Sequence, residues 1–305
     1  SLTVFQPLIP PDWKMKLREG ELYAQVAFSA APEQGFEAGG HGVLKGGSAW
    51  MPDNQINGVD FVLPFRFSEG AWQLGTRGPI SLRIAEVVNQ VTVKNIAADL
   101  QGAYPWSENN PLLLSDVSAD LLGGKIIMQQ LRMPQHDPAL LRVQNISSSE
   151  LISAVNPKQF AMSGPVSGAL PLWLDNEKWI IKDGWLTNPG PMTLRIDKDT
   201  ADAVVKDNMA AGAAINWLRY MEISHSWTKI NLDNLGVLTM QSTVTGNSRV
   251  DGKVGTVNLN YTHEENVFTL WRSLRFGDNL QAWLEQNAAL PETHCPEGKE
   301  CEEQQ

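Results

Sequence analysis

The sequence predicts a mainly β protein made of successive antiparallel hairpins, with a few helices near its C-terminal end. Along many stretches apolar and polar residues alternate with a period of two, which is typical of strands with one face on an apolar interior. Gly, Asn and Asp pairs fall between these stretches, as they do in hairpin turns. A chain of 305 residues is long enough to bury a large core, so its stability does not require oligomerisation.

The clearest predicted strand covers residues 59–67 and would be about 30 Å long at 3.3 Å per residue. Its polar residues Asp60 and Arg66 fall on the face opposite its apolar residues. The same alternation predicts strands at 22–28, 80–84, 117–121, 170–174 and 257–261. The apolar face of these strands carries Val59, Phe61, Leu63, Phe65, Phe67, Leu82, Ile84, Leu170, Leu172, Leu174 and Leu259.

Turns are expected wherever small or amide residues interrupt this alternation. The expected turns are Gly39-Gly40, Gly46-Gly47, Asp53-Asn54, Gly123-Gly124, Asp175-Asn176, Asp183-Gly184 and Asp251-Gly252.

Three segments have a helical pattern instead. Ser147 and Glu150 form a capping box that opens a short helix over 147–156, which Pro157 must stop. Residues 201–221 are Ala-rich with apolar residues at helical spacing, and 264–289 read as an amphipathic helix. Trp271, Leu274, Trp283 and Leu284 lie on its apolar face, and we expect them to pack over the end of the sheet as a lid.

The acidic tail, residues 290–305, contains both cysteines of the chain, Cys295 and Cys301. Their spacing allows a small disulfide loop that contributes about 2 kcal/mol in the chain-entropy model. Free thiols and a metal site with His294 are the alternatives. We expect the disulfide, which indicates the periplasm or another oxidising compartment.

Charge and motifs argue against several functional classes. A net charge of −10 repels a nucleic-acid backbone, and no apolar run approaches the roughly 20 residues of a membrane-spanning helix. No histidine has a second histidine at metal-ligand spacing, and Ser167 is one position off the spacing of a nucleophile elbow. Gly123-Gly124-Lys125 lacks a phosphate-binding loop. We therefore expect no catalytic residues, no metal, no cofactor and no nucleic-acid partner.

The eleven tryptophans have two interpretations. Most lie on or beside the alternating runs, which favours a core or a groove lining. The alternative is a set of stacking platforms for sugars, which would make the protein a carbohydrate binder or hydrolase. Alternation alone also leaves open whether the apolar faces close on one another as a β-sandwich or line an open surface.

Several segments resemble one family, the AsmA-like envelope proteins. The resemblance rests on Gly164-Pro-Val-Ser-Gly-Ala-Leu-Pro-Leu-Trp-Leu174 and on segments 179–186, 189–195, 121–127, 141–152 and 257–274, in that family's order. Together they cover roughly residues 118–276, whereas residues 1–117 show only strand patterning.

The resemblance implies a bridge-like lipid transfer protein: a long, twisted, antiparallel β-sheet that forms an apolar groove along which phospholipid acyl chains cross the periplasm. It also implies an inner-membrane anchor before Ser1 and a small outer-membrane lipoprotein that adds strands at the C-terminal edge. The apolar residues of the predicted strands would then line the groove. The expected division is a groove segment at 1–117, an AsmA-like groove segment at 118–263, the helix and the tail. The alternative is an envelope interaction module that binds a partner strand without carrying lipid.

Overall fold

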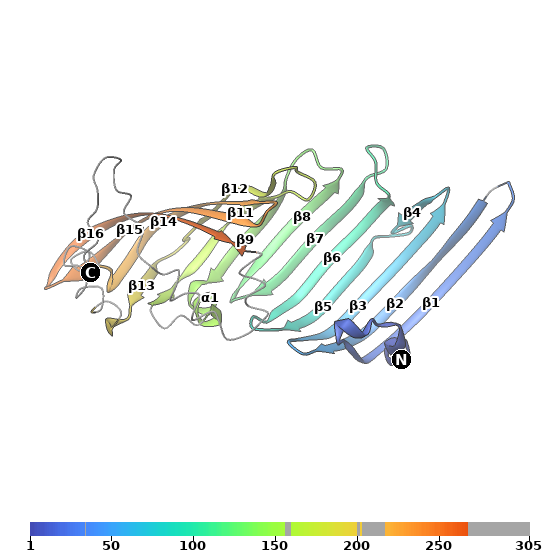
Figure 1. Ribbon diagram of the computed structural model, residues 1–305, viewed down its shortest axis with the longest axis horizontal. Helices are drawn as coiled ribbons and strands as arrows, with labels where there is room; N and C mark the ends of the chain where they lie inside the picture. The colour runs from blue at the N-terminus through green and yellow to red at the C-terminus, as the bar shows by residue number, and fades with distance from the viewer. Residues whose placement is uncertain (34, 156–159, 200–201, 203–216, 268–305) are drawn as a thin grey trace, which may run out of the picture.

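The computed structural model describes residues 1–33, 35–155, 160–199, 202 and 217–267. These residues form one antiparallel sheet of 16 strands, which confirms the predicted mainly β, antiparallel fold (Figure 1). Two short 3-10 helices, η1 (Leu2–Leu8) and η2 (Pro11–Trp13), precede the sheet. The strands are β1 (Lys16–Ala31), β2 (Gly35–Met51), β3 (Asn54–Ser68), β4 (Ala71–Leu74), β5 (Ile80–Val88), β6 (Val93–Tyr104), β7 (Leu112–Leu121), β8 (Gly124–Met133), β9 (Ala139–Ser147), β10 (Phe160–Ser163), β11 (Pro165–Leu172), β12 (Trp179–Thr187), β13 (Met192–Ile196), β14 (Tyr220–Asp233), β15 (Val237–Val250) and β16 (Lys253–Asn266).

The N-terminal part of the sheet is a meander in which neighbours in sequence are neighbours in space. One end of β3 pairs with the short β4 and the remainder pairs with β5. The C-terminal part branches, because β14 pairs along its length with β12, β13 and β15. Because the strands lie side by side, most strand ends fall along two long rims of the sheet. We call them the upper and lower rims after their positions in Figure 1.

One predicted turn, Asp251-Gly252, is a tight two-residue loop, and the turn predicted at Gly123-Gly124 lies one residue earlier, because Gly124 already begins β8. Leu122 and Gly123 between β7 and β8, and Asp251 and Gly252 between β15 and β16, all have positive φ angles of 48° to 76°. Two consecutive positive φ angles give the type I′ geometry that matches the twist of the flanking strands.

Three of the predicted turns are wrong. Gly39-Gly40 and Gly46-Gly47 lie inside β2, and Asp183-Gly184 lies inside β12. A Cβ on Gly40 would lie 2.2 Å from the backbone oxygen of Gln25, so this glycine permits the close approach of β1. Gly46 and Asp183 have φ angles of 59° and 56°, as in bulges.

Irregular positions with positive φ recur along the sheet. Asn95 in β6, Asp116 in β7, Asn145 in β9 and Asp183 in β12 have φ angles of 50° to 56°, and a register irregularity in a ladder of each strand lies at or beside them. Asn and Asp tolerate this left-handed conformation better than other residues with a Cβ. Because bulges increase twist and bend the strand, this series favours curling of the sheet.

The helical predictions have mixed outcomes. A helix α1 (Ser148–Val155) lies within the predicted 147–156. The predicted helix over 201–221 is wrong at its end, because Tyr220 and Met221 pair with β13 and β15 in β14. The start predicted at Glu264 is also wrong, since β16 continues through Asn266. Most of 201–221 and all of 268–289 lie outside the described residues, and no described helix is long and apolar enough to cross a bilayer.

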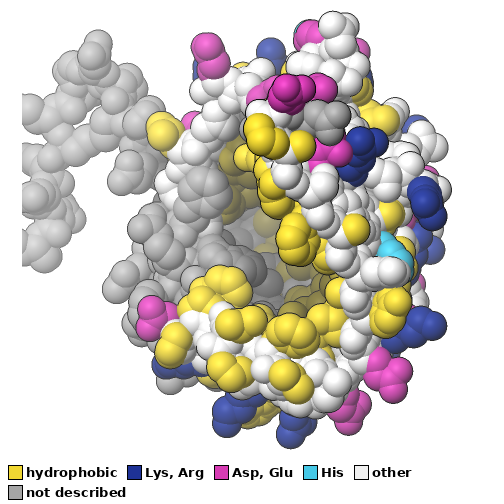
Figure 2. Space-filling view, turned by 90° about the vertical axis from the view of Figure 1, so that its right-hand side faces the viewer, with side chains coloured by type: hydrophobic (Ala, Val, Ile, Leu, Met, Phe, Trp, Pro, Cys, Tyr) yellow, Lys and Arg dark blue, Asp and Glu magenta, His cyan; other side chains and the backbone are white. Residues whose placement is uncertain are grey.

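Curling gives the sheet an inner and an outer face. Viewed from the β1 end, the molecule is hollowed, with hydrophobic side chains along the wall of the hollow and most charged side chains outside (Figure 2). Two buried clusters belong to the inner face. One contains Met128, Leu131, Met133 and Ala139, and the other contains Met192, Met221 and Ile223.

Candidate functional site

The inner face carries a continuous row of apolar side chains from strand to strand. Residues directly opposite each other in an antiparallel pair share a face, so the registers trace this row. Phe61 lies opposite Leu44 on one side and Leu82 on the other. Farther along, Leu114 lies opposite Leu100 and Leu131, and Leu141 lies opposite Met128 and Leu170. The row therefore crosses β2 to β11.

The registers bring most of the predicted lining residues onto this face. Leu63, Phe65 and Phe67 of β3 lie opposite Gly42, Gly40 and Ala38, so large side chains stand beside small ones. Ile84 lies opposite Val59, Leu172 lies opposite Ala139, and Leu259 lies opposite Val244.

Leu174 is the exception. The predicted strand 170–174 is too long, because β11 ends at Leu172 and the backbone N–H of Leu174 donates to Gln135 Oε1 at 2.7 Å. Its side chain is 61% exposed. The proposed lid residues Trp271, Leu274, Trp283 and Leu284, and the cysteines Cys295 and Cys301, lie outside the described residues.

The groove differs along its length. At the N-terminal end its wall is open, since the inward residues Val26 and Phe28 of β1 are 55% and 77% exposed. At the C-terminal end the second cluster fills the inner face: Met221 is fully buried, and the cluster to which it belongs packs with residues of β10, β11, β13, β15 and β16. Leu259 belongs to this packed region.

Sequence periodicity did not predict the first cluster, which contains Met128, Leu131, Met133 and Ala139. Leu114 and Val117 both pack against it although they are three residues apart. The positive φ of Asp116 lies between them and shifts the alternation by one residue. An Asp or Asn within an apolar run is the sequence signal that could have indicated such a shift.

Most ion pairs lie on the outer face. Arg83 meets Asp99 at 2.9 Å and Lys229 meets Asp183 at 3.0 Å. The pKa of the Asp120 carboxyl lies below its usual value, chiefly because Asn95 Nδ2 donates to it at 2.8 Å and secondarily because Lys125 is 3.5 Å away.

An inward polar group interrupts the apolar wall on β16. His263 and Glu265 both lie in β16, opposite Met240 and Leu238. His263 Nε2 is 3.8 Å from Glu265 Oε2, and its Nδ1 shares a hydrogen bond of 3.2 Å with the Tyr261 hydroxyl. No cluster of three potential metal ligands occurs among the described residues.

One tryptophan pair departs from the expected core or groove lining. Trp185 and Trp227 stack with ring centroids 5.1 Å apart and an interplanar angle of 8°. The registers put Trp227 on the same outer face as Lys229, and its side chain is 45% exposed.

Comparison with known proteins agrees with this geometry. A family model described as YdbH-like, intermembrane phospholipid transport protein YdbH, matches residues 1–289. The chain is 82% identical over its full length to the probable phospholipid transport protein YdbH of Escherichia coli (strain K12). It spans 35% of the length of that relative. No solved structure matches. An inner wall of apolar side chains on a curled antiparallel sheet thus accompanies a family match across nearly the whole chain, and the chain belongs to the YdbH-like family.

Proposed function

We propose that this chain is a periplasmic segment of an intermembrane phospholipid transfer bridge, and that acyl chains move along its inner face. The observation that supports this most directly is the apolar row that crosses β2 to β11 without an inward charged residue at the rungs named above. Such a surface needs no discrete binding site, because each strand offers the next apolar contact.

The energetics explain why a continuous wall is required. Exposing an acyl chain to water costs about 0.8 kcal/mol per CH₂. A sixteen-carbon chain would therefore cost on the order of 12 kcal/mol to pass through water, and a wall with an apolar rung on every strand offsets most of that cost. The outward ion pairs of the same strands keep the other face hydrated.

The family supports the choice of cargo, since the relative is named a probable phospholipid transport protein. Because this chain spans 35% of that relative, we propose that further strands continue the groove and that the longer chain reaches an inner-membrane anchor. Catalysis has no role in this proposal.

The proposal is tested by placing one charge on each face of β3. Leu63 faces inward opposite Gly42, whereas its neighbour Val62 faces outward and is 41% exposed. Leu63→Asp should remove phospholipid that co-purifies without detergent, because an acyl chain lying on the wall would have to desolvate the carboxylate. Val62→Asp should leave it bound. The measurement is native mass spectrometry with lipid extraction.

Circular dichroism of both variants serves as the folding control. Equal lipid content in folded Leu63→Asp and Val62→Asp would contradict transport along the inner face. Equal loss of folded protein would direct the test to Phe61→Asp, with Asp60→Ala as its outward neighbour.

A second role, partner binding, is favoured by the edge of β16. Among the described strands β16 pairs with β15 alone, over 14 residues. We propose that a small outer-membrane lipoprotein adds a strand there. Residues two apart on an antiparallel strand point their N–H groups to the same side, and counting from the two-residue turn places that of Asn260 on the free edge. Asn260→Pro should abolish co-purification of the lipoprotein while Asn260→Ala retains it, and both should keep bound phospholipid.

A further inference from the structure

Aromatic side chains gather at the upper rim of the groove. The registers place Phe28, Phe36, Phe67, Trp72 and Tyr104 on the inner face, at the rim ends of β1, β2, β3, β4 and β6. They are unusually exposed for such large side chains: Phe28 is 77%, Phe36 54% and Tyr104 52% exposed. Trp106 follows in the loop after β6 and is 39% exposed.

These rings form a strip along the rim, in which Phe36, Phe67 and Trp72 make one group of ring contacts and Tyr104 and Trp106 make another. The centroids of Phe36 and Phe67 are 6.0 Å apart, and those of Phe67 and Trp72 are 4.9 Å apart. Trp72 lies directly opposite Tyr104, which in turn meets Trp106 edge to face at 5.8 Å. The strip therefore runs across successive strands in the direction of the groove.

The strip combines apolar surface with unsatisfied donors. Within the described part of the chain, neither the Tyr104 hydroxyl nor the indole N–H of Trp72 or Trp106 makes a hydrogen bond to protein. Tyr and Trp with an apolar body and a free polar group are the residues that concentrate where hydrocarbon meets lipid headgroups.

The lower rim has a different composition. At the lower ends of β5, β6 and β7, Val87 lies opposite Val93 and Val93 lies opposite Leu121. Between residues 73 and 159, Tyr104 and Trp106 are the only Phe, Tyr or Trp residues, and both belong to the upper rim. Over β5 to β9 aromatic residues thus occur at the upper rim alone, and the lower rim combines aliphatic residues with the polar Gln90 and Thr92 of the β5–β6 loop.

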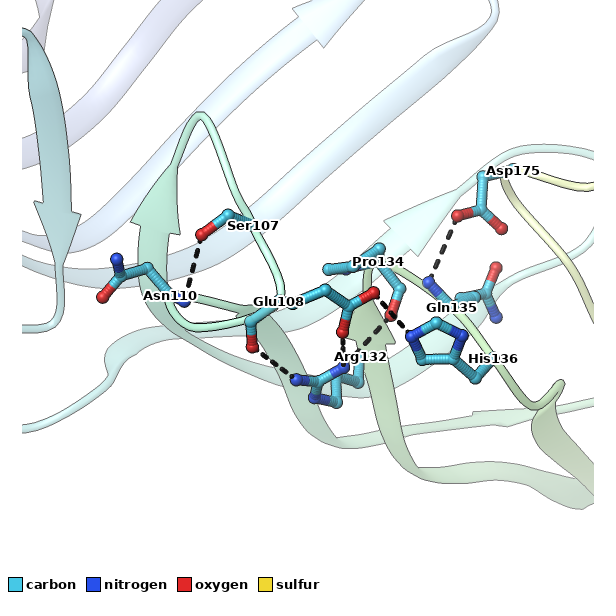
Figure 3. A network of polar contacts seen from close by, with 8 residues as sticks. All are labelled: Ser107, Glu108, Asn110, Arg132, Pro134, Gln135, His136 and Asp175. Carbon is cyan, nitrogen blue, oxygen red and sulfur yellow. Dashed lines mark hydrogen bonds and ion pairs between the residues drawn. The ribbon is translucent and has the colours of Figure 1, made fainter.

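A polar network holds the loop that carries Trp106 (Figure 3). Arg132 Nη2 donates to the backbone oxygen of Glu108 at 3.0 Å, and the Glu108 carboxylate meets His136 at 2.6 Å and Arg132 at 3.7 Å. The loop between β8 and β9 is joined to the loop between β11 and β12, because the backbone N–H of Gln135 donates to Asp175 at 3.2 Å. These contacts join three upper-rim loops to one another, and they hold the loop that carries Trp106 at the end of the strip.

We infer that phospholipids travel with their glycerol and headgroup region at the upper rim, against this aromatic strip, and with their acyl chains directed toward the inner wall. The inference rests on the proposed function and adds a fixed orientation of the cargo. Free donors of Tyr104, Trp72 and Trp106 meet ester or phosphate oxygens, while their rings cover the first methylenes. Over β5 to β9 the lower rim has no aromatic residue, so in the opposite orientation no ring with a free donor covers the first methylenes.

The test uses the full-length protein and vesicles of phosphatidylethanolamine and phosphatidylglycerol that contain one of two photoreactive phospholipids. One carries a diazirine on its headgroup and the other carries it at the end of an acyl chain. Peptide mapping after irradiation should show several-fold more headgroup labelling at 67–74 and 104–111 than at 86–93 and 119–124. The acyl-end probe should label the inner wall around Phe61 and Leu141.

A triple variant with Tyr104→Phe, Trp72→Phe and Trp106→Phe keeps an aromatic ring at each position and removes the three hydrogen-bond donors. It should lower headgroup labelling of the upper rim and leave acyl-end labelling of the wall in place. Val87→Ala with Leu121→Ala at the lower rim is the matched control and should change neither. Equal headgroup labelling of both rims, with wall labelling intact, would overturn the inferred orientation but not transport. Absence of labelling by either probe would overturn transport itself.

Discussion

Met221→Ala tests how the groove is closed at its C-terminal end. Met221 has no exposed surface and forms a cluster with Met192 and Ile223, against which partly buried residues of β10, β11, β13, β15 and β16 pack. Truncation to Ala removes two carbons and one sulfur, which at about 0.8 kcal/mol per methylene equivalent is roughly 2.4 kcal/mol of lost burial. The cavity left behind raises the cost, so we expect about 3 kcal/mol, within the range of buried Met→Ala changes.

The loss should be local, because each strand of this elongated sheet packs mainly against its immediate neighbours, as in repeat proteins. Hydrogen exchange measured by mass spectrometry should show amide protection falling by about 100-fold in β13, β14 and β15, the factor that 3 kcal/mol corresponds to. Protection in β1 to β3 should not change.

Leu235→Ala is the matched control, since Leu235 lies between β14 and β15 and is 76% exposed. Its effect should be below about 0.5 kcal/mol. A loss below about 1 kcal/mol for Met221→Ala would show that the cluster is not a packed core. Equal loss of protection in every strand would show that the sheet unfolds as one unit, against the local reasoning.

Two further outcomes follow from particular contacts. Gly168→Ala should destabilise the pairing of β11 with β12, because the new Cβ would lie 2.0 Å from the backbone oxygen of Trp185. Hydrogen exchange in β11 and β12 should increase in this variant and should not change in Gly35→Ala. Asn95→Ala should raise the pKa of Asp120 toward its ordinary value of 3.8, measured by NMR titration, because it removes the largest cause of the lowered pKa. The folded pKa of Asp120 is depressed, so its stabilising contribution is present above the unfolded pKa of about 3.9 and is lost as pH falls through the folded pKa. The stability difference between the wild type and Asn95→Ala should therefore narrow at more acidic pH, down to the pH-independent cost of placing Ala at a positive φ.

The sequence determined the class of fold because period-two alternation is a local property. The alternation in residues 59–67 places Phe61, Leu63 and Phe65 on one face of a strand, as they are in β3. Tight turns such as Asp251-Gly252 are equally local, since positive φ angles favour Gly and Asp. The motif order across 121–274 also carried the family resemblance.

Only the tertiary structure decided which glycines lie within strands rather than in turns, and which apolar residues share a face. Gly40 lies within a strand because the backbone of Gln25 approaches it from β1, a contact between residues distant in sequence. Asp116 reverses the alternation of β7, so Leu114 and Val117 point the same way, and His263 faces inward because β16 extends past it. Pairing across strands sets these positions, and it is also what places Tyr104 beside Trp72 at one rim.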